Sequence, residues 1–229
     1  MANSIIKTEN IKKNYYKNDI VVKAVRGVDL EVKKGEFTAI VGPSGSGKTT
    51  FLNVISGLDD PTEGKVWLKN KLLSGMSKKE LSNFRRDHIG FIFQAFNLIP
   101  VLTAEENIEY VMQLQGVPKN ERHERVLSIL EEMGLKGYHD TLPIHLSGGQ
   151  QQRVAVARAM VSKPLIIFAD EPTANLDSKT SEDLLNNMRE LNEETGMTFL
   201  FSTHDELVMK RAKRVVVLKD GKIEKDYKK

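Results

Sequence analysis

The segment from Gly42 to Thr49 reads Gly-Pro-Ser-Gly-Ser-Gly-Lys-Thr, and it constrains the fold of this chain more than any other feature. It fits the G-x-x-x-x-G-K-[ST] phosphate loop, which joins the end of a β-strand to the start of an α-helix. The strand-like stretch Glu36–Val41 precedes it, and the helical stretch Lys48–Ser56 follows it. The alternative of an ordinary Gly-Ser surface loop would not need a strand before it and a helix after it. A dinucleotide-binding fingerprint would need a third glycine that is absent here.

The residue types of this loop suit the phosphates of a nucleoside triphosphate. Glycines let backbone N–H groups turn toward phosphate oxygens, and the following helix offers the positive end of its dipole. Lys48 can reach the β- and γ-phosphates, and the Thr49 hydroxyl can bind Mg²⁺. We expect nucleotide contacts from nine consecutive residues, namely Gly42, Pro43, Ser44, Gly45, Ser46, Gly47, Lys48, Thr49 and Thr50.

A second acidic element lies downstream, where the apolar strand Leu165–Ala169 ends in Asp170 and Glu171. Phosphate-loop enzymes use an acid in this position to reach Mg²⁺, so Asp170 is the candidate metal partner. Glu171 can orient and polarise a water for attack on the γ-phosphate. The alternative is that the two acids simply end a buried strand in solvent.

The order of strands and helices predicts an α/β fold of the P-loop NTPase (RecA-like) type with a mostly parallel sheet. Alternating apolar residues in Ile5–Lys12 and Val21–Val32 predict an N-terminal antiparallel β layer. Helical spacing dominates from about 95 to 160, which predicts an inserted helical subdomain. We expect one domain over 1–229, with a catalytic core formed by about 1–94 and 161–229.

Charge and composition exclude several classes of protein. The formal net charge is only +3, which argues against a dedicated nucleic-acid binder. The absence of cysteine excludes a disulfide scaffold, a thiolate zinc site and a cysteine nucleophile. The stretch Met1–Asn10 lacks the apolar run of a signal peptide, and the longest apolar run, Leu165–Ala169, is far too short to cross a bilayer. Any membrane role is therefore expected to come through a partner.

Four further segments carry a family resemblance. Leu146–Gln150 reads Leu-Ser-Gly-Gly-Gln, Gly90–Gln94 ends in a glutamine, Ala174–Asp177 follows the paired acids, and Ser202–His204 ends in a histidine. In this order and spacing they resemble the signature motif, glutamine loop, D-loop and switch histidine of ATP-binding-cassette ATPases, over essentially the whole chain. By itself, the Ser-Gly-Gly could be only a helix N-cap followed by a turn.

This resemblance implies ATP as the nucleotide, Mg²⁺ as the metal and ATP hydrolysis as the reaction. It implies a head-to-tail homodimer, in which the signature residues of one chain bind the ATP held by the other, with contacts from Ser147, Gly148, Gly149 and Gln150. Asp177 would carry communication between the two sites.

The resemblance also implies roles for residues outside the two phosphate-binding segments. His204 would contact the γ-phosphate and hold the water and Glu171 in register. Gln94 would contact Mg²⁺ or the attacking water. Tyr15 lies where the family places an aromatic residue that stacks on adenine, although the adjacent Tyr16 has the same ring. We expect Lys48, Gln94, Glu171 and His204 to be the catalytic residues.

Within the family, the stretch Gly90–Asn107 is similar to the macrolide-exporter and lipoprotein-release branch. Ala174 departs from the glycine usual there. The branch implies a separate transmembrane permease, export or mechanotransmission, and a cytoplasmic location on the inner face of the membrane.

The alternative is a soluble ATPase of this family acting on the ribosome or DNA, but the chain has neither the two cassettes nor the long coiled coils of such proteins. A GTP-binding switch would need Asn-Lys-x-Asp, and Asn70-Lys71 is followed by two leucines.

Overall fold

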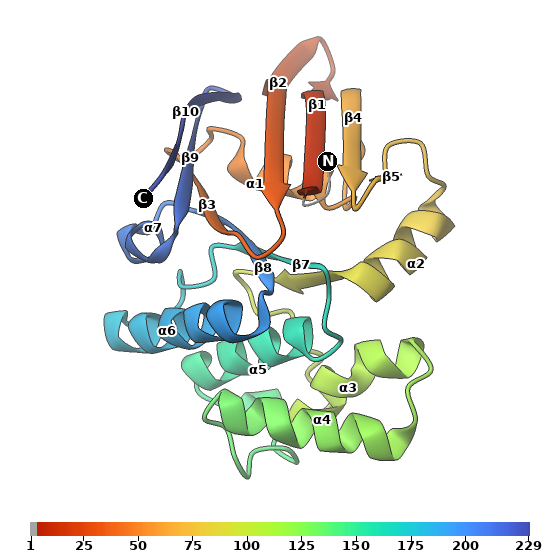
Figure 1. The fold of residues 1–229 in the computed structure, drawn as a ribbon, viewed down its shortest axis with the longest axis vertical. Helices are drawn as coiled ribbons and strands as arrows, with labels where there is room; N and C mark the ends of the chain where they lie inside the picture. The colour runs from red at the N-terminus through yellow and green to blue at the C-terminus, as the bar shows by residue number, and fades with distance from the viewer. Residues whose placement is uncertain (1–3) are drawn as a thin grey trace.

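The computed structural model describes residues 4–229 and arranges them in layers (Figure 1). A four-stranded antiparallel sheet has the order β2-β1-β4-β5, and a six-stranded sheet has the order β10-β9-β3-β8-β7-β6. The strands are β1 (Ser4–Lys17), β2 (Ile20–Lys33), β3 (Phe37–Val41), β4 (Glu63–Leu68), β5 (Lys71–Leu72), β6 (Ile89–Ile92), β7 (Ile166–Asp170), β8 (Thr198–Thr203), β9 (Arg214–Lys219) and β10 (Lys222–Lys228).

The helices are α1 (Lys48–Ile55), α2 (Lys78–His88), α3 (Ala104–Leu114), α4 (Lys119–Glu132), α5 (Gly148–Met160), α6 (Ser178–Thr195) and α7 (Glu206–Arg211). A short 3-10 turn, Pro143–His145, precedes α5. In Figure 1 the antiparallel strands lie at the top, the larger sheet runs through the middle, and α3 to α6 lie below it. The expected α/β fold with an N-terminal antiparallel layer is confirmed.

The larger sheet is parallel from β6 to β9, and only β10 runs antiparallel to its neighbour. Its central strands are buried on both faces, and alternate side chains enter different cores. On β8, Phe199 and Phe201 pack toward the helices α3 to α6, whereas Leu200 packs toward α1 and the antiparallel sheet. The sheet thereby separates two apolar cores and places the carboxyl ends of its strands at one edge.

Helix α1 is held between the two sheets, with contacts to β1 and β2 on one side and to β7 and β8 on the other. Its apolar residues Phe51, Leu52 and Ile55 are buried in the core that both sheets share. Since the phosphate loop leads directly into α1, both sheets determine where this loop lies.

Two features differ from the expectation from sequence. Helix α2 was not predicted, because its only buried residues are Leu81 and Phe84 and its apolar stripe is therefore short. It begins at a capping box in which Ser77 and Glu80 bind each other's backbone N–H groups, which stabilises a helix start. The first hairpin is also longer than the segments Ile5–Lys12 and Val21–Val32, since β1 continues to Lys17 and β2 begins at Ile20. Residues 1–3 of the N-terminal stretch, and of the expected domain, lie outside the described residues.

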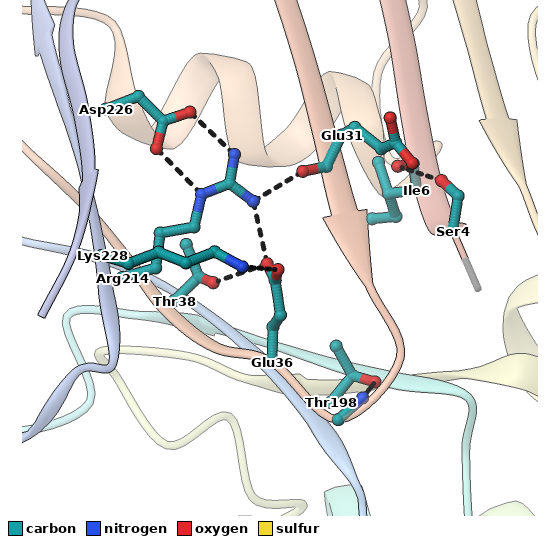
Figure 2. Close-up of polar contacts among 10 residues, drawn as sticks. Ser4, Ile6, Glu31, Glu36, Thr38, Thr198, Arg214, Asp226 and Lys228 are labelled. Carbon is teal, nitrogen blue, oxygen red and sulfur yellow. Dashed lines mark hydrogen bonds and ion pairs between the residues drawn. The ribbon is translucent and has the colours of Figure 1, made fainter. Parts of the chain in front are cut away.

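An ion network attaches the C-terminal hairpin to the rest of the fold (Figure 2). The Arg214 guanidinium makes two hydrogen bonds with the Asp226 carboxylate, of 2.8 and 2.7 Å, and donates to Glu36 Oε2 at 2.8 Å. It also donates to the backbone carbonyl of Glu31, at 2.7 Å. Arg214 therefore joins β9 and β10 to β2 and to the residue before β3. Its hydrogen bonds hold the pKa of Asp226 below the usual range.

We expect Asp226→Asn to lower the free energy of unfolding by about 1–2 kcal/mol at pH 7, because one charged partner of Arg214 is lost. Since folding lowers the pKa of Asp226, its contribution is present above the unfolded-state pKa of about 3.9 and is lost as pH falls through the folded-state value. The difference between the variant and the unmodified chain should therefore shrink below about pH 4.

Denaturant unfolding across pH measures this difference. Glu224→Gln is the matched control, because Glu224 lies on the same strand and makes only an exposed 3.4 Å pair with Lys219. We expect it to change stability by less than about 0.5 kcal/mol. An equal loss in both variants would contradict the structural role of the Arg214 network.

Candidate active site

The phosphate loop turns from β3 into α1 through glycines that packing and conformation require. Gly47 is the N-cap of α1 with φ 98°, and a Cβ built on it would lie 2.3 Å from the backbone oxygen of Ala24. No larger residue fits there without moving β2. Gly45 has φ 76°, and nothing lies within 4 Å of the position of its Cβ, so the space in front of the loop is open. The loop is thus held from behind and exposed in front.

The side chains of the loop are arranged to receive an anion. Lys48 is 8% exposed, and its ammonium donates to the carbonyl oxygens of Gly42 at 2.9 Å and Pro43 at 3.1 Å. The hydroxyl of Ser46 is buried and has no hydrogen-bond partner within the described residues. A buried hydroxyl without a partner is unfavourable, and a phosphate oxygen would satisfy it. These residues therefore fit the triphosphate of a nucleotide.

The acid at the end of β7 meets the phosphate loop directly. Thr49 Oγ1 donates to Asp170 Oδ1 at 3.0 Å, so the two candidate metal ligands are adjacent. Burial raises the pKa of Asp170, while the hydrogen bond from Thr49 and the charge of Lys48 act in the opposite direction. Among residues 4–229, no group of three or more His, Cys, Asp or Glu residues could hold a metal ion. A hydroxyl next to one carboxylate fits Mg²⁺, which takes its remaining ligands from phosphates and water.

Glu171 has a strained backbone and a tightly held carboxylate. Its φ is 45°, a conformation that few residues other than glycine adopt, and its N–H donates to the Ser202 carbonyl at 2.8 Å. Thr203 Oγ1 donates to Glu171 Oε2 at 2.9 Å, and His204 Nδ1 lies 2.7 Å from Glu171 Oε1. The structure therefore brings together Glu171 and His204, which lie 33 positions apart in sequence. The Glu171 side chain is 13% exposed and that of His204 is 71% exposed, so the histidine faces solvent.

The residues that hold Glu171 include two that the sequence analysis missed. Besides contacting Glu171, Thr203 accepts a hydrogen bond from the Asp205 N–H at 3.0 Å, and Asp205 in turn accepts one from the Thr173 hydroxyl at 2.6 Å. Asp205 also caps α7 through the Leu207 N–H. The sequence did contain a signal for Asp205, since an acid directly before a short helix is a common N-cap. Nothing in the sequence indicated that Thr203 would contact Glu171.

The signature segment lies at the start of α5. Ser147 and Gln150 form a capping box, in which Ser147 Oγ accepts from the Gln150 N–H at 3.3 Å and Gln150 Oε1 accepts from the Ser147 N–H at 2.8 Å. The N-cap interpretation is therefore correct for Ser147, and it is compatible with a ligand, because the hydroxyl proton stays free to be donated. At Gly149 a Cβ would lie 2.6 Å from Thr180, whereas at Gly148 the nearest atoms are 3.8 Å away.

A polar hollow of about 510 Å³ lies in front of this segment. Its lining includes Ser147 to Gln150 from the signature and Asn175 to Asp177 from the D-loop, but none of the residues Gly42–Thr50. Within one chain, the signature hollow and the phosphate loop are therefore separate. A larger and more apolar cavity of about 600 Å³ lies between α4, the end of α5 and α6, and none of the candidate catalytic, nucleotide-binding or metal-binding residues lines it.

The remaining candidate residues lie at the edges of the site. Gln94 is exposed, and its backbone carbonyl accepts a hydrogen bond from Asn175 Nδ2 at 2.7 Å, so the glutamine loop and the D-loop are in contact. Asp177 is the N-cap of α6 and binds the Thr180 N–H at 3.0 Å. Ala174 is not among the residues with positive φ, so the D-loop backbone does not require a glycine there.

The two adjacent tyrosines differ in their surroundings. Tyr15 donates from its hydroxyl to Asp59 at 3.0 Å, and the Lys13 ammonium lies 5.1 Å from the centre of its ring. Burial raises the pKa of Tyr15, and the Thr50 side chain acts in the opposite direction. Tyr16 is 67% exposed. Tyr15 is 43% exposed, and its stacking on adenine stays a prediction.

Comparison with known proteins decides the family. The model of the family described as ABC transporter matches residues 25–174. The chain belongs to the ABC transporter family. It is 46% identical over 98% of its length to the uncharacterized ABC transporter ATP-binding protein MJ0796 of Methanocaldococcus jannaschii, and covers 97% of that protein. It is 44% identical to the lipoprotein-releasing system ATP-binding protein LolD of Bacteroides thetaiotaomicron, over 97% of this chain and all of that one.

A solved structure of the MJ0796 cassette, described as dimeric, in a post-hydrolysis state and bound to ADP and Pi, matches with a TM-score of 0.91. The identity is 45%, and the match covers 97% of this chain and 98% of that chain. This chain is accordingly an ATP-binding and ATP-hydrolysing subunit of an ABC transporter. Across residues 4–229, none of its helices has the length and apolar character needed to span a membrane.

We expect Thr203→Val to lower kcat for ATP hydrolysis by about 10- to 100-fold, because a hydrogen bond to a charged carboxylate contributes about 1.5–3 kcal/mol. The affinity for ATP should stay unchanged, since Thr203 contacts Glu171 and not the phosphate loop. Steady-state hydrolysis and equilibrium nucleotide binding measure the two quantities. Thr203→Ser keeps the hydroxyl and is the control. A Thr203→Val variant with unchanged kcat would show that this hydroxyl does not position Glu171.

Proposed function

We propose that the chain works as a head-to-tail homodimer, in which each ATP lies between the phosphate loop of one copy and the signature segment of the other. The observation that carries this proposal is the separation of the two sites within one chain. The signature hollow contains open helix N-terminal groups and the Ser147 hydroxyl, but no phosphate-loop residue lines it. A twofold pair gives each phosphate loop a signature segment from the other copy.

Within each site, the side chains divide the work. Lys48, which is held by the carbonyls of Gly42 and Pro43, neutralises charge on the β- and γ-phosphates. Thr49 and Asp170 would hold Mg²⁺, with Gln94 as a further contact, and the metal would neutralise charge on the phosphates. From the other copy, Ser147, Gly148, Gly149 and Gln150 supply hydrogen-bond donors at the positive end of α5.

Hydrolysis requires a base next to the attacking water, and Glu171 fits this role. Its carboxylate is held by Thr203 and lies 2.7 Å from the His204 ring, so its orientation is fixed before ATP binds. Glu171 accepts the proton of the water as the oxygen attacks the γ-phosphorus. The bond from the γ-phosphorus to the β,γ-bridging oxygen breaks, so that ADP leaves, and His204 turns from Glu171 to the γ-phosphate. The exposure of the histidine leaves it free to make this movement. Asp177 and Asn175, in the lining of the signature hollow, then link one site to the other.

We further propose that a separate membrane permease receives the movement and that the chain works at the cytoplasmic face of the membrane. The family membership and the similarity to a lipoprotein-releasing ATP-binding protein support this partner. The helical segment 95–160 is the part that rotates relative to the core formed by 1–94 and 161–229. An action on the ribosome or DNA is the second candidate, and co-purification of a ribosome or DNA instead of a membrane protein would favour it.

We expect Glu171→Gln to bind ATP, to lose at least about 100-fold in hydrolysis, and to elute as a dimer in saturating Mg-ATP. The amide still accepts the hydrogen bond from Thr203 but cannot accept the proton of the water, so ATP persists between the two copies. Size-exclusion chromatography with and without Mg-ATP measures the assembly. Lys48→Ala is the control and should neither bind ATP nor dimerise with itself. A Glu171→Gln variant that stays monomeric at saturating Mg-ATP would contradict the shared site.

A further inference from the structure

A partly buried arginine at the end of α5 binds the turn that follows β6. Arg158 Nη1 donates to the carbonyl of Asn97 at 2.6 Å, and its Nη2 donates to the carbonyl of Phe96 at 2.8 Å. Among the ion pairs of residues 4–229, none involves Arg158. Burial lowers the pKa of this guanidinium. Placing a cation there without a carboxylate partner is unfavourable, so its two backbone acceptors are the interactions that keep it in place.

The two residues that Arg158 binds have strained backbones. Phe96 has φ 56° and Asn97 has φ 50°, and both lie in the left-handed region that favours glycine. Asparagine tolerates this region, but it is uncommon for a large aromatic residue. Two consecutive residues persist in this conformation only where the surroundings hold them. Arg158 makes contact with both of their carbonyl groups, so it is placed to hold this turn.

A second contact fixes the other end of the same segment to α5. A Cβ built on Gly90, in β6, would lie 2.3 Å from the backbone oxygen of Ala159, the residue after Arg158. Strand β6 and the end of α5 are therefore in direct backbone contact. Gln94 lies between these two attachment points, four residues after Gly90 and two before Phe96.

We infer that Arg158 is a positioning residue for Gln94, which couples the glutamine loop to the signature helix. Because Ser147 begins α5 and Arg158 lies in its last turn, a rotation of this helix moves the signature segment and the glutamine loop together. Arrival of the signature segment at the opposite nucleotide then sets the position of Gln94 next to the metal. This inference rests on the metal contact that we propose for Gln94.

The test is Arg158→Met in the full chain, which removes the donors and keeps an unbranched side chain of similar shape. We expect kcat to fall by about 10- to 100-fold, because a displaced catalytic group costs rates of this order. The Mg²⁺ concentration for half-maximal hydrolysis should rise, while affinity for ATP in the absence of metal should stay unchanged. Arg158→Lys should have an intermediate effect, since an ammonium cannot reproduce the fixed fork of the guanidinium.

A rescue experiment separates positioning from general stability. Asn97→Gly removes much of the cost of the left-handed turn. Combined with Arg158→Met, it should recover part of the lost kcat and shift the Mg²⁺ requirement back toward that of the unmodified chain. Arg189→Met is the matched control, because Arg189 also donates to a backbone carbonyl, that of Arg211 at 2.6 Å, but on α6. We expect this control to lower stability without changing the Mg²⁺ requirement.

Gln94→Ala distinguishes the failure of this inference from the failure of the proposed function. If Gln94→Ala raises the Mg²⁺ requirement and a folded Arg158→Met or Arg158→Lys does not, the positioning role is overturned and the site assignment stands. If Gln94→Ala leaves kcat and the Mg²⁺ requirement unchanged, both the role of Gln94 and the coupling through Arg158 are overturned. A variant of Arg158 that loses thermal stability but keeps kcat and its Mg²⁺ requirement also overturns the inference.

Discussion

The close approach of two sheets to the phosphate loop is the constraint on which the rest of the structure depends. Gly47 lies against the backbone oxygen of Ala24 in β2, and a Cβ on Gly42 would lie 2.0 Å from the backbone oxygen of Leu218 in β9. The Gly221 N–H also donates to the Ser46 carbonyl at 3.0 Å. The antiparallel layer and the C-terminal hairpin therefore both pack against the loop. The Arg214 network joins this hairpin to β2 and to Glu36.

Of the nine non-glycine residues with positive φ among residues 4–229, three lie in the glutamine loop and the paired acids. Glu171, Phe96 and Asn97 all have positive φ without being glycine, and each is held by hydrogen bonds from a neighbouring element. Such conformations cost about 1–3 kcal/mol each and persist only where other contacts fix them. The contacts of Glu171 come from β8, and those of Phe96 and Asn97 come from α5. A change in the position of α5 therefore changes which loop conformation is favoured, and this can convert nucleotide binding into movement.

The sequence predicted the fold and the central motifs because these follow local rules. The strand before Gly42, the helix after the phosphate loop and the apolar strand before Asp170 each depend on a few neighbouring residues, and the structure contains all three. Helix α2 was missed because only Leu81 and Phe84 form its buried stripe. Thr203 and Arg158 could not be assigned from sequence, because their partners lie 32 and about 60 positions away and are brought near only by the sheet and by α5.

The central claim is that each chain supplies the phosphate loop of one nucleotide site and the signature segment of the other. Mixing two inactive variants tests this claim most directly. Lys48→Ala lacks a working phosphate loop, and Gly148→Asp places a negative charge in a signature segment where a side chain fits the single chain. If sites are shared, a mixed dimer contains one intact site, and an equimolar mixture should regain up to about a quarter of the unmodified ATPase activity. A mixture no more active than either variant alone would contradict the account.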